Sequence, residues 1–112
     1  MTPDFDKYAE GLELLMAEAN IPDHMHGAIS RYIVDGIPPG SFLTALMAND
    51  LVETLGRADY MNKGLVPNYV EWFYQHAPSP CWGSYSRVNE WQKRGGARGI
   101  QKERDSNEKA PS

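Results

Sequence analysis

Residues 36–50 read Gly-Ile-Pro-Pro-Gly-Ser-Phe-Leu-Thr-Ala-Leu-Met-Ala-Asn-Asp. A rigid Pro-Pro-Gly turn leads directly into a run whose apolar side chains recur at helical spacing. The first N–H groups of a helix have no partner within it, and this run ends at two small polar side chains, Asn49 and Asp50. The stretch therefore predicts a small helical protein built around a polar pocket.

Length and composition indicate a single globular domain. The chain has 112 residues, of which 41% are hydrophobic and 11% aromatic, enough for one modest core. A formal net charge of -4 argues against general nucleic-acid binding, which needs a basic face. No apolar run reaches the length of a membrane span, and no signal-peptide core follows Met1. One cysteine excludes an internal disulfide, so we expect a cytoplasmic setting.

Helix signals divide the first half of the chain. Residues 2–4, Thr-Pro-Asp, are a good start for a first helix. Its apolar stripe consists of Phe5, Tyr8, Leu12, Leu15 and Ala19. A second helix is expected over about 22–35, with Gly36 as its left-handed cap. After the proline turn, Ser41 can cap a third helix, which is expected to break near Asn49.

The second half is predicted to hold a long helix, a short helix and a tail. The long helix should cover about 58–76, where Pro67 predicts a kink or two short helices. Ser84 or Ser86 can cap the short helix. Residues 95–112 are rich in glycine and charge, which is typical of a disordered tail. The predicted fold is an all-α bundle of four to five short helices, one domain over residues 1–94.

The helix start at Gly40, Ser41 and Phe42 is a candidate anion site. Free N–H groups, the positive end of a helix and a hydroxyl suit a phosphate or carboxylate. Arg31, in the preceding helix, could fold back to supply a charged fork. The simpler alternatives are plain helix capping and an exposed arginine.

A second set of candidates combines amides with carboxylates. It consists of Asn49, Asp50, Asp59 and Asn62, and a bend near Gly56 could bring the two acids together. Amide and carboxylate groups suit directional hydrogen bonds to sugar hydroxyls or base edges. Two carboxylates could also perform acid–base chemistry. The alternative is that Asn49 or Asp50 caps one helix and Asp59 begins the next.

The loop Cys81-Trp82-Gly83-Ser84 offers an aromatic face. Trp82, with Tyr74 or Tyr85 nearby, could stack on a nucleobase, or it could close the core from the loop. Cys81 and His76 invite a thiolate–imidazole interpretation, but no third orienting group is evident. The three histidines lack zinc-type spacing, so we predict no metal and no cofactor.

Between Tyr32 and Trp91 the chain carries Gly36-Ile37-Pro38-Pro39-Gly40-Ser41-Phe42-Leu43, Asn49-Asp50-Leu51, Ala58-Asp59, Phe73-Tyr74, Pro78 and Cys81-Trp82-Gly83-Ser84. This run resembles a family of short phage-borne proteins. The family pattern is Gly-x-x-Pro-Gly-x-Phe-Leu, Asn-Asp-Leu, Ala-Asp, an aromatic pair and Cys-aromatic-Gly-Ser. The match covers more than half of the chain, and the N-terminal helix and the tail fall outside it. The resemblance implies a viral accessory protein that acts in the cytoplasm of an infected bacterium, where such proteins often counter host defence.

These observations lead to three functional hypotheses. The first is a non-catalytic protein that sequesters a small nucleotide-derived signal, in a pocket that a second subunit of a homo-oligomer completes. Its expected ligand-binding residues are Arg31, Gly40, Ser41, Phe42, Asn49, Asp50, Asp59, Asn62, Tyr74, Trp82 and Ser84. The second is an acidic helical inhibitor of a host defence protein. The third is a small nucleotide hydrolase that uses Asp50, Asp59 or Cys81.

Overall fold

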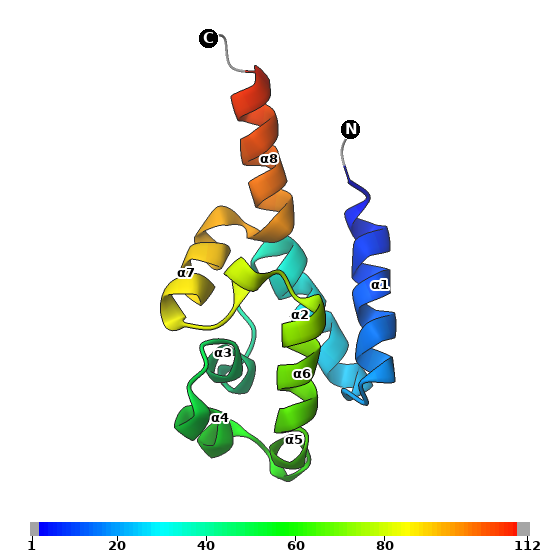
Figure 1. Ribbon diagram of the computed structural model, residues 1–112, viewed down its shortest axis with the longest axis vertical. Coiled ribbons are helices and arrows are strands. Elements are labelled where there is room, and N and C mark those ends of the chain that lie inside the picture. Colours follow the sequence, from blue (N-terminus) through cyan, green and yellow to red (C-terminus); the bar gives the residue numbers. More distant parts are fainter. Residues whose placement is uncertain (1–2, 110–112) are drawn as a thin grey trace.

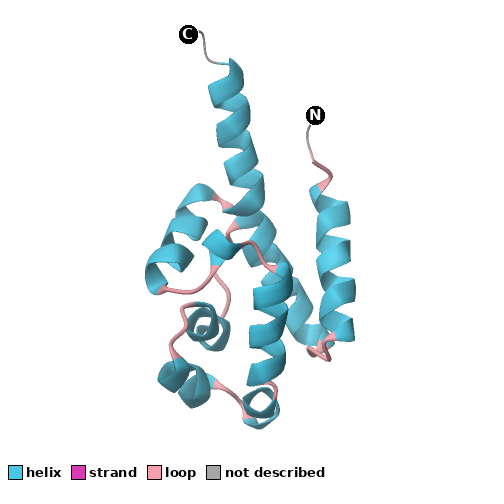
Figure 2. Ribbon diagram, viewed as in Figure 1, coloured by secondary structure: helices cyan, strands magenta, loops and turns pink. Residues whose placement is uncertain are grey.

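The computed structural model describes residues 3–109. Over this range the chain forms eight α-helices and one 3₁₀ turn, with no strand (Figure 1, Figure 2). The elements are α1 (Phe5–Glu18), α2 (Asp23–Asp35), α3 (Ser41–Met47), α4 (Leu51–Arg57), α5 (Tyr60–Gly64), α6 (Val66–His76), η1 (Ser79–Cys81), α7 (Tyr85–Arg94) and α8 (Gly96–Lys109). The all-α prediction is confirmed, and the helices are more numerous than four to five.

The first two helices begin and end close to the residues that local chemistry indicates. Asp4 caps α1, its side chain accepting the N–H of Lys7 at 3.1 Å, while Thr2 lies outside the described residues. Asn20 adopts a left-handed conformation (φ 62°) in the turn to α2. Gly36 ends α2 at φ 69°, which confirms the predicted cap.

Short capped helices follow the proline turn. The chain breaks at Asn49 as predicted, and the Asp50 carboxylate caps α4 by accepting the N–H of Glu53 at 3.2 Å. Asp59 caps α5 in the same way. The segment 58–76 forms two helices, because Pro67 fits in the first turn of α6 but not in a helix interior.

The predicted disordered tail is wrong over residues 96–109, which form α8. Its start lies against the end of α2, because Gly36 and Gly96 approach so closely that a Cβ on Gly96 would lie 2.5 Å from the Gly36 nitrogen. Arg98 then donates to Asp35 at 2.7 Å. Residues 110–112 lie outside the described range. Contacts between segments some sixty residues apart in the sequence therefore order this region.

The buried side chains of the described residues form one hydrophobic core. The largest fully buried side chains are Trp72, Tyr32, Tyr69, Phe73, Met16, Ile29, Ile33, Met47, Val88 and Cys81. Hydrogen bonds connect distant segments inside it: the Tyr32 hydroxyl donates to the Cys81 carbonyl at 2.6 Å. Trp91 Nε1 donates to the carbonyls of Tyr32 at 3.0 Å and Ile33 at 3.2 Å.

The molecule is elongated, with extents of 53 × 27 × 19 Å. In Figure 1, α8 projects at the end where α1 begins, while α4 and α5 lie at the opposite end. Within the described residues, no helix has the length and apolar character needed to span a bilayer.

Candidate functional site

The predicted ligand-binding residues lie in separate parts of the structure. One group joins the starts of α4 and α7. Tyr85 donates its hydroxyl to Asp50 at 2.7 Å, and the other carboxylate oxygen caps α4. Ser84 caps α7 by accepting the N–H of Arg87 at 3.1 Å, as predicted. Asn49 is exposed in the left-handed conformation. Most polar groups here already have protein partners.

A second group forms a hydrogen-bonded chain that reaches the core. Asp59 accepts the backbone N–H of Asn62 at 2.7 Å, and Asn62 accepts the hydroxyl of Tyr69 at 2.7 Å. Tyr69 contacts Phe42 edge-to-face at 5.4 Å between ring centroids. Burial, with a smaller contribution from Asp59, raises the pKa of Tyr69 to about 12. This network satisfies buried polar groups, which is a structural role.

The helix start at residues 40–42 differs from the predicted anion site. Gly40, not Ser41, occupies the cap position of α3, so Ser41 is exposed as the first helical residue. Phe42 is buried in the core. Arg31 folds along its own helix over Gly27, with a guanidinium nitrogen 2.9 Å from where a Cβ of Gly27 would lie. It therefore points back along α2 rather than toward the turn.

Trp82 and Tyr74 do not form one aromatic platform. Trp82 is half-buried and lies against Phe73, with ring centroids 5.8 Å apart. Tyr74 is 81% exposed. Of the eleven predicted residues, Arg31 alone lines any of five hollows found on the described surface. The predicted convergence on a single cavity is therefore not observed in these hollows.

Cys81 lacks the surroundings of a nucleophile. Its side chain is completely buried, and burial raises the pKa of the thiol to about 12, so the thiol stays protonated at neutral pH. The His76 ring lies against Trp72, at 5.9 Å between centroids. Within residues 3–109, no group of three or more His, Cys, Asp or Glu side chains is arranged to hold a metal ion.

The candidate site with the most apolar lining is a groove between α1, α7 and α8, with a volume of about 470 Å³. We call it the α1–α8 groove. It is lined by Pro3, Phe5, Tyr8, Pro78, Pro80, Trp91, Arg94, Ala97, Ile100, Gln101 and Arg104. Small-molecule sites have volumes of roughly 300–1,000 Å³ and a mostly apolar lining with few polar groups. The groove has this character.

Local structure explains how the groove forms. Phe5 and Tyr8 are one turn apart on α1, and Ala97 and Ile100 are one turn apart on α8, so each pair faces the same side of its helix. Trp91 is 5% exposed and is held by its indole hydrogen bonds to α2. The groove therefore has a rigid aromatic floor.

The charge in the groove is positive. Arg94 and Arg104 line it, and among the described residues no acidic side chain does. Arg94 donates to Glu103 at 2.9 Å, which partly neutralises its charge. Arg104 is exposed at the rim. Two guanidinium groups beside an apolar floor suit a ligand with an apolar body and an anionic group.

Sequence reasoning missed this groove because its wall is α8, which was predicted to be disordered. The available signal was weak: Ala97 and Ile100 at helical spacing, with Arg94 and Arg104 ten residues apart on the same segment. The sequence pattern places Phe5 and Tyr8 in the apolar stripe of the first helix, but it does not indicate that they line a groove.

A second surface feature is an apolar face at the opposite end. We call it the α4–α5 face, and its exposed residues are Leu51 (63%), Val52 (80%), Leu55 (40%), Tyr60 (96%) and Met61 (62%). Scattered exposed apolar residues are normal, but five of them on two short helices that follow each other in the chain are more than folding requires and favour a contact surface.

Comparison with known proteins gives no further guide to this chain. No protein-family model, no curated protein and no solved structure matches it. The resemblance to phage-borne proteins stays a prediction, and any functional conclusion depends on the groove and the α4–α5 face.

Proposed function

We propose that this protein binds, without changing it chemically, a small ligand that combines an aromatic or apolar body with an anionic group. The observation that carries the proposal is the α1–α8 groove, where an apolar floor lies beside Arg94 and Arg104. A nucleotide-derived signal has both chemical features: the base can lie on aromatic side chains, and the phosphate can accept hydrogen bonds from guanidinium groups.

The residues around the groove favour binding over catalysis. Among the described residues that line it, there is no carboxylate, histidine or cysteine to act as base or nucleophile. Burial, with a smaller effect of Cys81, raises the pKa of Tyr8, so its hydroxyl keeps its proton at neutral pH. Sequestration of a signal in an infected bacterium needs only such recognition, and the resemblance to phage-borne proteins favours that role.

The test is a binding assay with nucleotides, dinucleotides and ADP-ribose derivatives, using thermal shift and then calorimetry. Arg104→Gln removes a charge at the rim, and Ala97→Phe fills the groove. Each should weaken binding at least about tenfold, which corresponds to about 1.4 kcal/mol. Lys102→Gln, on the same helix but outside the groove lining, is the matched control and should bind normally.

Mass spectrometry of the recovered ligand separates binding from turnover. An unchanged mass supports sequestration, whereas an altered mass indicates hydrolysis or transfer. No binding by any anionic ligand with an aromatic body, or equal binding by Ala97→Phe, would reject the proposal.

A second candidate function is protein binding through the α4–α5 face. Val52 and Tyr60, 80% and 96% exposed, favour an interaction surface because burying such side chains is the main driving force of association. The partner is a second copy of this chain or a host defence protein. Light scattering tests the first partner and affinity capture the second. Val52→Glu should abolish either interaction, whereas Leu14→Glu, at an exposed leucine on α1, should not.

A further inference from the structure

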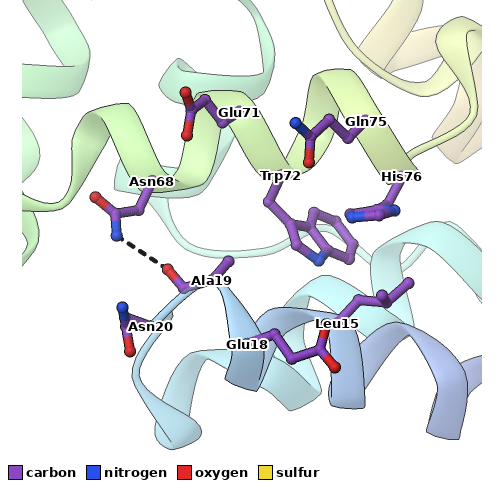
Figure 3. Close-up of a pocket in the computed structure, with 9 residues that line it drawn as sticks. All are labelled: Leu15, Glu18, Ala19, Asn20, Asn68, Glu71, Trp72, Gln75 and His76. Carbon is purple, nitrogen blue, oxygen red and sulfur yellow. Dashed lines mark hydrogen bonds between the residues drawn. The ribbon is translucent and has the colours of Figure 1, made fainter.

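A cleft between the end of α1 and one side of α6 differs in chemistry from the α1–α8 groove. Its volume is about 330 Å³ (Figure 3). We call it the α1–α6 cleft, and it is lined by Leu15, Glu18, Ala19, Asn20, Asn68, Glu71, Trp72, Gln75 and His76. Asn68 donates its side-chain amide to the Ala19 carbonyl at 2.9 Å, which joins the two helices at one end of the cleft.

One buried donor in this cleft has no acceptor. Trp72 is 1% exposed, and its indole nitrogen lacks a hydrogen-bond partner among the described residues. Figure 3 shows the ring between the helices, with the nitrogen on the side that faces α1, Leu15 and Glu18. By contrast, Trp91 Nε1 donates to two carbonyls. Because buried donors are nearly always paired, the Trp72 N–H indicates a missing acceptor.

The charge around the cleft is negative. Glu18 and Glu71 line it from opposite helices, and both side chains are exposed. The C-terminal end of α1 adds a partial negative charge from its carbonyl groups. Among the described residues, no lysine or arginine lines the cleft. A cationic group is therefore favoured here, whereas an anionic group is favoured in the α1–α8 groove.

We propose that the α1–α6 cleft binds a small protonated amine that also carries an oxygen acceptor, the chemistry of an amino sugar. The ammonium group binds at the Glu18 carboxylate, Glu71 adds negative charge from the α6 side, and an oxygen of the ligand accepts the Trp72 N–H. Glu18 is exposed, so its side chain can turn toward the ammonium group and leave room for the oxygen. The cleft volume is at the lower end of the range for small-molecule sites.

The indole N–H signals in a ¹H–¹⁵N correlation spectrum report on this contact directly. The chain has three tryptophans, and standard side-chain experiments assign their signals without mutation. Glucosamine, below the pKa of its amine, is the probe. Glucose retains the oxygens but not the charge, and cyclohexylamine retains the charge but not the oxygens. We expect a saturable downfield shift of the Trp72 signal with glucosamine alone, while the already bonded Trp91 signal stays in place.

Substitutions at the rim test the charge without disturbing the core. The double variant Glu18→Gln, Glu71→Gln should weaken glucosamine binding at least about tenfold. Glu13→Gln, also on α1 but outside the cleft lining, should leave it unchanged. A Trp72 signal that glucosamine does not move, that glucose moves equally, or that responds equally in the double variant would overturn the proposal. A Trp72 N–H that only exchanges with solvent would show a water-filled cleft and would also overturn it.

Discussion

The helices at the two ends of the molecule are held in place by different kinds of contact. At the α8 end, apolar side chains such as Trp91 are covered, and an interhelical ion pair of 2.7 Å between Asp35 and Arg98 fastens α8 to α2. At the α4–α5 end, short helices are fixed by their caps, Asp50 and Asp59, and apolar side chains such as Val52 face solvent. One end therefore depends on tertiary contact and the other on local capping.

We expect the α8 end to contribute more to the stability of the fold, and the α4–α5 end to contribute more to the recognition of a partner. Contacts between distant segments bury Trp91 and partly bury Ala97 and Ile100 near α8, and burial is the dominant favourable term in folding. The α4–α5 face leaves apolar surface available to a partner. We therefore expect substitutions at the α8 end to lower the free energy of unfolding strongly, and those at the α4–α5 end to affect it little.

The largest effect is expected for Gly96→Val. Gly96 has φ 69°, and a Cβ there would lie 2.5 Å from the Gly36 nitrogen, so both the backbone and the helix contact become strained. We predict a loss of about 3 kcal/mol or more in the free energy of unfolding, measured by denaturant titration. Gly11→Ala is the control: nothing lies near its Cβ position, and alanine should stabilise α1 by up to about 1 kcal/mol.

Equal stability of the Gly96→Val and wild-type proteins would show that α8 is not held by this contact. Loss of ligand binding in Gly96→Val, with the remaining helices folded by circular dichroism, would instead show that the groove needs α8 in place, because α8 forms one of its walls.

The local parts of the fold could be predicted from the sequence, and the long-range parts could not. Gly36, Asp50 and Ser84 act as caps because a cap depends on neighbouring backbone groups. The helix α8 was missed because its composition resembles a tail. Its order depends on the contact between Gly96 and Gly36 and on the ion pair between Arg98 and Asp35. A local sequence pattern cannot predict contacts between residues so far apart in the chain.

The predicted site residues do not line one hollow together, for a related reason. The residue types were plausible, but side-chain direction depends on packing. Arg31 points back over Gly27, Phe42 enters the core, and Asp59 is used by its own helix. The same polar groups that suit a ligand also suit a helix end, and here Asp50, Asp59 and Ser84 cap helices.

The second prediction concerns pH and the buried Cys81. Burial raises the pKa of its thiol from its ordinary value to about 12, so the thiol ionises in the unfolded chain at a lower pH than in the folded protein. Stability is therefore complete below about pH 9 and falls as the pH rises toward 12, by about 1.4 kcal/mol per pH unit from this group. Cys81→Ala should reduce this slope, leaving the part that buried tyrosines such as Tyr69 contribute, and an unchanged slope in denaturant titrations across this range would contradict the assignment.

A smaller effect is expected for Asp50→Ala, which removes the cap of α4 and the acceptor for Tyr85. Loss of a cap of this type destabilises by about 1 kcal/mol. Asp50→Asn should retain much of the stability, because an asparagine side chain can also cap. A loss as large as that of Gly96→Val would show that the two ends are not different in the way proposed.

The smallest effect on stability is expected for Val52→Glu, at a side chain that is 80% exposed. The free energy of unfolding should change by less than about 0.5 kcal/mol. Light scattering should nevertheless show whether self-association is lost, since a buried charge at an interface is unfavourable. If Val52→Glu unfolds the protein, the α4–α5 face is part of the core rather than a contact surface.

Calorimetry of a nucleotide ligand with the wild-type, Ala97→Phe and Lys102→Gln proteins measures whether the α1–α8 groove is the ligand site. We expect saturable binding to the wild-type and Lys102→Gln proteins, and at least about tenfold weaker binding when the phenylalanine side chain fills the groove. Undiminished binding to Ala97→Phe, with the variant folded, would contradict it.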